Sequence, residues 1–167
     1  MIAALKDCNR LPCNAHLIAT VLRNTFDFNK EQKKSFLFQN AKEVYLCIEA
    51  CKRIVVCIKR SGRNLKLART VKLMCDTRWN TLVNMLESVL ASLPEILDLL
   101  IKNNETSKLE GWNAEIATEL VNFLVPFRTV SVELQAKKTP TINVVLIRYH
   151  DLLKHCVVDS DKDHQVS

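Results

Sequence analysis

Apolar residues recur at intervals of three and four along most of the chain, which is the spacing of one face of an α-helix. The clearest run is Val44, Ile48, Cys51, Val55 and Ile58. It predicts a long helix over about 30–60, and Gly62 in the following "SGRN" marks its end. The segment "RIVVCI" would suit a buried strand in isolation, but the helical spacing that flanks it favours a helix.

The same spacing predicts two more helices in the first hundred residues. One covers 13–28. The other has its apolar stripe over 79–100, and Asp76 or Thr77 is expected to cap its first turn because short polar side chains accept the first unpaired amide hydrogens. Pro94 is expected to kink or divide this helix, because its ring removes one backbone donor and clashes with the preceding turn.

Two helices are predicted in the last third of the chain. One covers about 113–137 and contains Pro126. The other opens at Thr139 and Pro140. Its periodic apolar residues are expected to face inward, namely Ile142, Val145, Leu146, Tyr149, Leu152 and Leu153. Residues 159–167 are polar and are expected to form a frayed tail.

The composition supports a single helical domain. The chain has 167 residues, of which 48% are hydrophobic, so it can bury a core of its own. It contains only two glycines and four prolines, whereas strand-rich domains need many tight turns built from these residues. The predicted fold class is therefore all-α, with five to six amphipathic helices in one domain over 1–158.

The net charge of +6 permits an acidic partner such as nucleic acid but does not require one. Seven basic side chains are concentrated between positions 59 and 78, with Asp76 as the only acid among them. They are Lys59, Arg60, Arg63, Lys66, Arg69, Lys72 and Arg78. The segment is either a weak, sequence-tolerant and salt-sensitive DNA contact or a solvated loop.

The chain has seven cysteines, and its beginning, "MIAALKDCNR", does not resemble a secretory signal peptide. No run approaches the roughly 18 apolar residues of a membrane span, so no membrane association is expected. An intracellular protein with reduced cysteines is expected. Cys47 and Cys51 share one helix face and are predicted to be buried thiols, since a free cysteine behaves as a small hydrophobe.

Few residues point to catalysis or to a cofactor. There is no Gly-rich phosphate loop, no nucleophile elbow and no pair of carboxylates in an apolar setting. Cys8, Cys13 and His16 could supply three zinc ligands, but a fourth is not visible at a suitable spacing. Neither a metal site nor a cofactor is therefore predicted.

Four segments nevertheless resemble one family in the expected order. "DTRWNTLVNMLESV" resembles the Thr-Arg-Trp-Asn segment and following helix of transposases of the hAT superfamily and their zinc-finger BED-type relatives. "RLPCNAHLIATVLRNTF", "RSGRNLKLARTVK" and "ELVNFLVPFRTVSVELQAKKTPTINVVLIRYHDLL" resemble three further segments, and together the four cover about 1–155. The chain departs from the usual pattern at Thr139, where tyrosine is common, and at Ile18-Ala19, where Leu-Asn is common.

The resemblance implies a place within a larger enzyme. Such transposases have a ribonuclease-H-like core whose Asp-Asp-Glu triad binds two metal ions for attack on phosphodiesters, and a helical domain is inserted in that core. This chain resembles the Cys-x-x-His segment and much of the insertion. Asp7 does not match the second aspartate, and the triad and the BED finger are expected to be missing. A catalytically inactive, nuclear fragment is therefore expected.

The resemblance also suggests roles for individual residues. Arg78 and Trp79 are similar to residues that contact the DNA end, where a tryptophan stacks on an extrahelical base; such stacking contributes roughly 1–3 kcal/mol. An equally good interpretation places Trp79 in the core. Cys13 is expected to pack, and His16 is either a neighbour of a lost active site or an ordinary histidine at a helix start. The candidate nucleic-acid-binding residues are Arg63, Arg69, Lys72, Arg78 and Trp79.

Two functions remain open. One is a transposase-derived domain with weak, non-specific nucleic-acid contact. The other is a helical module that binds a protein partner through its apolar faces. An exposed Trp79 beside Arg and Lys would favour the first function, and a large apolar surface without basic neighbours would favour the second.

Overall fold

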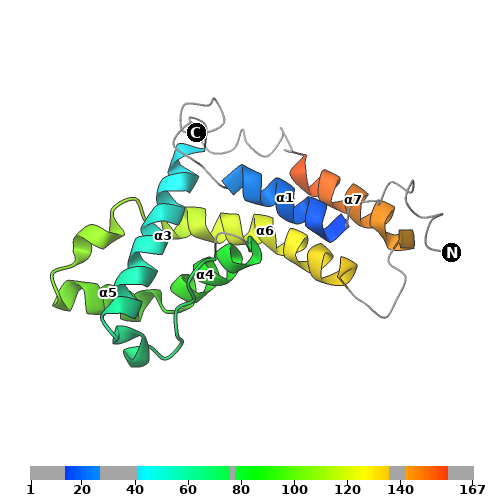
Figure 1. Ribbon diagram of the computed structural model, residues 1–167. Helices are drawn as coiled ribbons and strands as arrows, with labels where there is room; N and C mark the ends of the chain where they lie inside the picture. The colour runs from blue at the N-terminus through cyan, green and yellow to red at the C-terminus, as the bar shows by residue number, and fades with distance from the viewer. Residues whose placement is uncertain (1–13, 27–40, 76–77, 136–141, 158–167) are drawn as a thin grey trace, which may run out of the picture.

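The computed structural model describes residues 14–26, 41–75, 78–135 and 142–157 (Figure 1). The described residues form six α-helices and two 3₁₀ helices. The α-helices are α1 (Asn14–Phe26), α3 (Lys42–Arg60), α4 (Asn80–Ala91), α5 (Leu93–Lys102), α6 (Ala114–Leu134) and α7 (Ile142–Cys156), and the 3₁₀ helices are η3 (Arg63–Lys66) and η4 (Thr106–Leu109). Extended pairing in these ranges amounts to one isolated bridge between Cys75 and Arg78. The predicted all-α fold class is confirmed.

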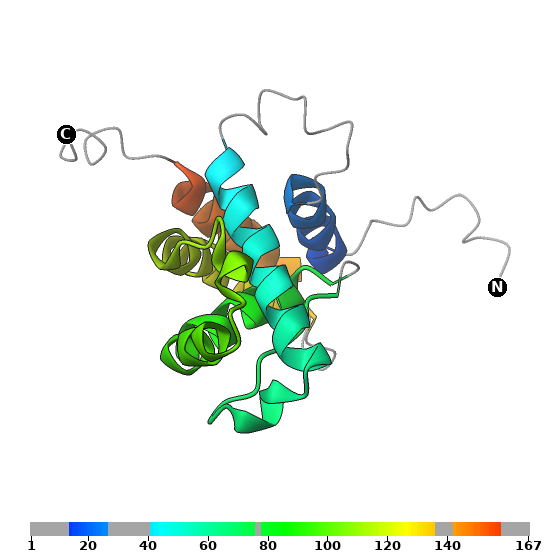
Figure 2. The same ribbon diagram turned by 90° about the vertical axis from the view of Figure 1, so that its left-hand side faces the viewer.

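Helix α6 is the central element, because α1, α3, α4 and α7 all pack against it (Figure 1). It begins at Asn113, whose side chain accepts hydrogen bonds from the amides of Glu115 at 2.8 Å and Ile116 at 3.2 Å. These bonds satisfy two of the amide hydrogens that the first turn leaves unpaired. The helix continues past Pro126. Figure 2 shows α3 lying across the end of α6 that is nearer the viewer.

The best-buried part of the core lies where α3, α4 and α6 meet. Ile54, Met85 and Leu124, one from each helix, have no exposed surface. The predicted burial of Cys47 and Cys51 is confirmed, since both are also fully buried. Burial raises the pKa of the Cys51 thiol far above its ordinary value, and the nearby Cys47 adds to the rise.

Pro94 divides the predicted third helix, as expected. Helix α4 ends at Ala91 and α5 begins at Leu93. Ser92 between them is both the C-cap of α4 and the N-cap of α5. The proline therefore lies in the first turn of α5, where its missing amide hydrogen would have had no partner within the helix.

The predicted start of that helix at Asp76 or Thr77 is wrong, although these two residues themselves lie outside the described part. Helix α4 begins at Asn80. The amide of Arg78 donates to the carbonyl of Cys75 at 2.9 Å. The hydroxyl of Thr81 accepts from the amide of Cys75 at 2.7 Å, so the first turn of α4 is tied to the chain ahead of it and the helix begins later than predicted.

The prediction that the periodic apolar side chains of α7 face inward is wrong at three positions. Leu146 is 81% exposed, Leu153 60% and Tyr149 39%, whereas Leu152 is buried. Spacing shows which side chains share a face, but it does not show whether a neighbouring element covers that face. Here α7 rests on α6, and much of its apolar surface is left uncovered.

Two other predicted helices agree with the structure, since α1 lies within 13–28 and α6 lies within 113–137. The helix predicted over about 30–60 is confirmed only in its later part, because α3 begins at Lys42 and Ala41 before it is a non-helical cap. Gly62 adopts the left-handed conformation, with φ of +69°, directly after Ser61, the C-cap of α3. Residues 27–40, 136–141 and 158–167 lie outside the described part. None of the described helices combines the length and hydropathy that crossing a bilayer requires.

Candidate nucleic-acid interface

Residues 63–75 form a basic segment that leads from η3 along α4 and α5, and it is called the basic strap below. After η3 it becomes extended at Leu67, with φ of −90° and ψ of 140°. Leu67 and Val71 point into the core and are 7% and 1% exposed. The side chains of Lys66, Arg69 and Lys72 are exposed. The strap thus buries Leu67 and Val71 and leaves these three cations in solvent.

Polar side chains hold the main chain of the strap in place. Ser88 is in α4, Ser92 is the cap between α4 and α5, and Glu95 is in α5. Asn64 is in η3. The bonds are, with the donor first, Ala68 N to Glu95 Oε2 at 2.8 Å, Val71 N to Asn64 Oδ1 at 2.8 Å, Lys72 N to Ser88 Oγ at 2.9 Å, and Ser92 Oγ to Arg69 O at 3.0 Å. Four backbone groups of this extended segment are therefore paired with side chains, and the exposed cations project from an anchored chain.

Arg63 is at the beginning of the strap, but its charge is already engaged. Its guanidinium forms an ion pair with Glu105, and its side chain is only 15% exposed. Hydrogen bonding from Arg63, with a smaller contribution from the Cys57 thiol, holds the pKa of the Glu105 carboxyl below its ordinary value. The structure therefore separates Arg63 from the exposed cations of the strap, contrary to the grouping made from the sequence.

Lys72 lies near a second ion pair. Arg128 on α6 binds the Glu87 carboxylate on α4 with two hydrogen bonds, at 2.8 and 2.9 Å. These bonds lower the pKa of Glu87, and the charge of Lys72 adds a smaller contribution. Because Glu87 is bound by Arg128, Lys72 keeps an exposed ammonium group that a further anion can approach.

Arg78 and Trp79 are neighbours in sequence but occupy different environments. Arg78 is exposed, and Trp79 is 6% exposed and belongs to the hydrophobic core. This burial agrees with the core interpretation of Trp79. Base stacking by Trp79 stays a prediction, and it would require the ring to leave the core. Arg78 lies at the entrance to α4 and can add its charge to those of the strap.

The two residues of the Cys-x-x-His segment are not brought into a site by the described structure. His16 is exposed on α1, and Cys13 lies outside the described residues, as does Cys8. Within the described ranges, no three or more His, Cys, Asp or Glu side chains are placed to share a metal ion. A zinc site involving Cys8, Cys13 and His16 is therefore untested.

Sequence reasoning missed the residues that anchor the strap. Ser88, Ser92 and Glu95 lie between 16 and 27 positions from their bonding partners. Serine and glutamate are common on solvated helix faces, so no local signal identified them. The run of cations at 66, 69 and 72 was visible in the sequence, but the way in which it is held was not.

Comparison with known proteins gives one informative similarity. No protein-family model matches the chain. The chain is 29% identical over 153 residues to the transposable element Hobo transposase of Drosophila melanogaster. The match covers 92% of this chain and 21% of that protein, so the chain spans about one fifth of the length of the curated relative. The BED finger and the fragment status expected from the motifs stay predictions, but the similarity supports a transposase-related origin for this chain.

Proposed function

We propose that this chain is a transposase-derived helical domain whose basic strap contacts the phosphate backbone of nucleic acid without cleaving it. The observation that carries the proposal is the anchored strap, from which Lys66, Arg69 and Lys72 project into solvent. The similarity to Hobo transposase, a protein of a transposable element, supports nucleic acid as the acidic partner.

The mode of contact follows from the side chains that are accessible. Lysine and arginine bind phosphate oxygens without regard to base sequence, and they release counterions as they do so. Because the strap is already ordered, binding does not require the loss of much main-chain freedom. The aromatic ring of Trp79 is buried, so phosphate contacts dominate over base stacking. The expected binding is weak, tolerant of sequence and sensitive to salt.

The absence of strand cleavage and the nuclear location are both proposals. They rest on the resemblance of the four sequence motifs, which implies that the metal-binding triad lies in other parts of the parental enzyme. Similarity to a transposase agrees with a protein that works beside nuclear DNA.

The experiment measures DNA affinity against salt concentration for the wild-type chain and two charge-matched variants. Four cations (Lys66, Arg69, Lys72 and Arg78) predict a slope of log K against log salt between about −3 and −4 on duplex DNA. Lys66→Gln/Arg69→Gln should make the slope shallower by roughly 2. The control Lys42→Gln/Lys154→Gln removes two exposed charges from α3 and α7. Equal losses in both variants would show that net charge alone drives binding and would reject the strap.

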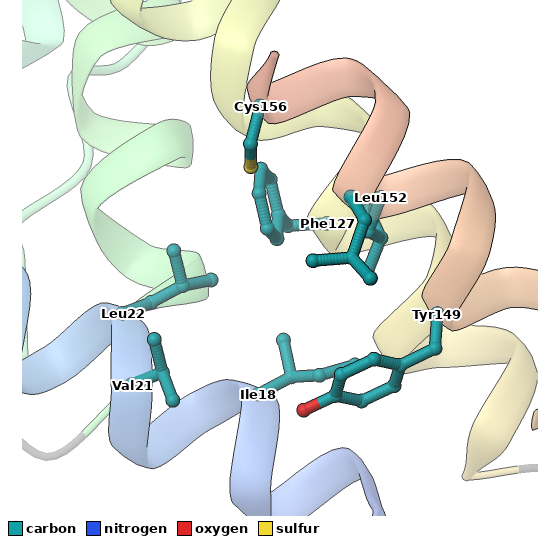
Figure 3. Close-up of a pocket in the computed structure, with 8 residues that line it drawn as sticks. Ile18, Val21, Leu22, Phe127, Tyr149, Leu152 and Cys156 are labelled. Atoms are coloured by element: carbon teal, nitrogen blue, oxygen red, sulfur yellow. The ribbon is translucent and has the colours of Figure 1, made fainter.

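A second candidate function is supported by the apolar surface around α7. Leu146, Leu153 and Val157 are exposed on or next to this helix, at 81%, 60% and 70%. Beside them lies an apolar pocket of about 180 Å³ between α1, α6 and α7 (Figure 3). Its lining includes Ile18 and Leu22 from α1, Phe127 from α6 and Tyr149 from α7. Such a surface is typical of a protein contact.

Light scattering tests the second function for the case in which the partner is another copy of this chain. Leu146→Glu/Leu153→Glu should abolish any concentration-dependent association that this face causes. The control Leu65→Glu/Leu73→Glu places the same charges at two exposed leucines of η3 and the strap. If the wild type stays monomeric and behaves like both variants, self-association through α7 is rejected.

A further inference from the structure

A hollow with an excess of positive charge lies between the second half of α3 and η4. Its volume is about 460 Å³. The side chains relevant to binding are Arg53, Cys57, Arg60, Ser61, Glu105 and Lys108. They come from two segments about 50 residues apart, so the run of cations in the sequence does not reveal the hollow.

The only carboxylate in this lining is already bound. Glu105 forms an ion pair with Arg63 and accepts a hydrogen bond from the Cys57 thiol at 3.2 Å. Lys108 is close enough to contribute to the lowered pKa of Glu105, but the first cause of that shift is the bond from Arg63. The carboxylate of Glu105 is therefore engaged mainly by Arg63.

The three cations of the lining have no carboxylate of their own among the described residues. Arg53 donates to the main-chain carbonyl of Glu110, which carries no net charge. Arg60 and Lys108 are in none of the ion pairs of the described part. Like charges gathered around one hollow repel each other, and a bound anion removes that repulsion.

The chemistry of the lining selects among anions. A guanidinium presents a planar set of donors that matches two oxygens of a phosphate, and an ammonium adds a point charge. The Ser61 hydroxyl offers a further polar group, although it already donates to the carbonyl of Cys57 at 2.8 Å. We propose that this hollow binds a phosphate group, carried either by a nucleic-acid backbone or by a free phosphate ester. The proposal stands on this cluster and does not depend on the strap.

Glu105 opposes the binding of an anion in the same hollow. Its carboxylate repels a phosphate, and the ion pair with Arg63 offsets only part of that negative charge. Glu105→Gln should therefore tighten phosphate binding, whereas loss of a cation should weaken it. These opposite responses distinguish a site from a general effect of charge.

The test is a titration of the folded chain with inorganic pyrophosphate, followed by the amide signals of Ser61 and Lys108 in NMR spectra at constant ionic strength. Saturable shifts of both signals are expected. Arg53→Gln/Lys108→Gln should weaken binding about tenfold or more, since hydrogen bonds to charged groups are the strong ones. Lys108→Gln alone leaves the Arg53–Glu110 contact intact, should weaken binding severalfold, and serves if the double variant does not fold.

Matched controls separate this site from the strap. Lys66→Gln/Arg69→Gln removes two charges from the strap and should leave pyrophosphate affinity within about twofold, because neither side chain lines the hollow. Glu105→Gln should tighten binding, and Glu119→Gln, at an exposed position on α6, should not. Unsaturable shifts, or equal weakening by the hollow and strap variants, would overturn the proposal.

A second titration identifies the source of the phosphate. An oligodeoxynucleotide without terminal phosphates is added to the pyrophosphate complex. Displacement of pyrophosphate at Ser61 and Lys108 assigns the site to a nucleic-acid backbone, and no displacement assigns it to a free phosphate ester. Either result supports the phosphate site. If the strap does not contact DNA, the salt slope of Lys66→Gln/Arg69→Gln will equal that of the wild type. That result is independent of the Ser61 and Lys108 signals, so the two proposals can fail separately.

Discussion

Ser92 donates a hydrogen bond from its hydroxyl to the main-chain carbonyl of Arg69 at 3.0 Å, while its own backbone joins α4 to α5. Its amide donates to the carbonyl of Val89, and its carbonyl accepts from the amide of Ile96. One buried serine thus holds the basic strap against the junction of two helices. The position of the exposed Arg69 therefore depends on Ser92, which is 1% exposed.

Replacing this serine should be costly, whereas replacing another buried serine should not. Ser92→Ala removes the donor to Arg69 and should lower the free energy of unfolding by about 1–3 kcal/mol. Ser131→Ala is the matched control, because Ser131 is fully buried and its hydroxyl has no hydrogen-bond partner among the described residues. That change should be neutral or stabilising. Urea denaturation of both variants checks the pair, and equal losses would show that the Ser92–Arg69 bond contributes nothing specific.

Trp79→Ala should destabilise the protein by about 3–5 kcal/mol, since it truncates a buried tryptophan. Leu65→Ala, at a leucine that is 90% exposed, should change stability by less than about 0.5 kcal/mol. Thermal melting measures both. An unchanged melting temperature for Trp79→Ala, together with weaker binding of single-stranded DNA, would favour the stacking role and contradict burial in the core.

The Glu87–Arg128 pair should make part of the stability depend on pH. Arg128 lowers the pKa of Glu87 below its ordinary value of 4.5, so the folded protein favours the ionised carboxylate. The contribution is present above 4.5 and is lost as the pH falls through the lower pKa of the folded state. The stability difference between wild type and Glu87→Gln should therefore shrink as the pH drops below this value. Glu119→Gln is the control, and urea denaturation at several pH values gives the comparison; a difference that grows in acid would contradict the assignment.

Cysteine labelling should follow burial. Cys75 and Cys156 are exposed, and Cys47 and Cys51 are buried with raised pKa values. Iodoacetamide should modify the exposed pair in the native protein and reach the buried pair only in denaturant, because the thiolate is the reactive form. Mass spectrometry of the labelled peptides identifies each site. Rapid native labelling of Cys51 would contradict its place in the core.

No cleavage or strand transfer of DNA is expected with Mg²⁺ or Mn²⁺. The resemblance assigns the metal-binding carboxylates to other parts of the parental enzyme, so this chain should lack a two-metal centre of its own. Incubation with a supercoiled plasmid, followed by gel electrophoresis, measures nicking. Metal-dependent nicking that disappears when a carboxylate of this chain is replaced would overturn the expectation.

The sequence predicted helices well because burial and spacing agree in the core. Ile48, Cys51, Val55 and Ile58 are spaced for one face of α3, and all four are buried. The same method failed for Leu146 and Leu153, because periodicity identifies a face without identifying what covers it. The predicted start of α4 failed for a different reason, since the Thr81 hydroxyl binds the main chain of Cys75 ahead of the helix.

The candidate sites were predictable only in part. The exposed cations of the strap were visible as a local run of charge. The Arg63–Glu105 pair joins residues 42 positions apart, and the hollow brings Arg53 near Lys108 across a similar distance in sequence. These side chains come together only when the helices pack, so their proximity cannot be read from the sequence. A list of basic residues therefore included Arg63, which is engaged elsewhere, and left out Arg53 and Lys108.

The anchoring of the strap also separates the residues that shape it from those that meet a ligand. The bonds that hold its main chain come from side chains of the helices and of Asn64, while Lys66, Arg69 and Lys72 hold none of them with their own side chains. Substitution at these three positions is therefore free of structural constraint from the anchors. Over evolutionary time such a surface can lose its charge, reverse it or acquire a new partner while the fold beneath it is inherited unchanged.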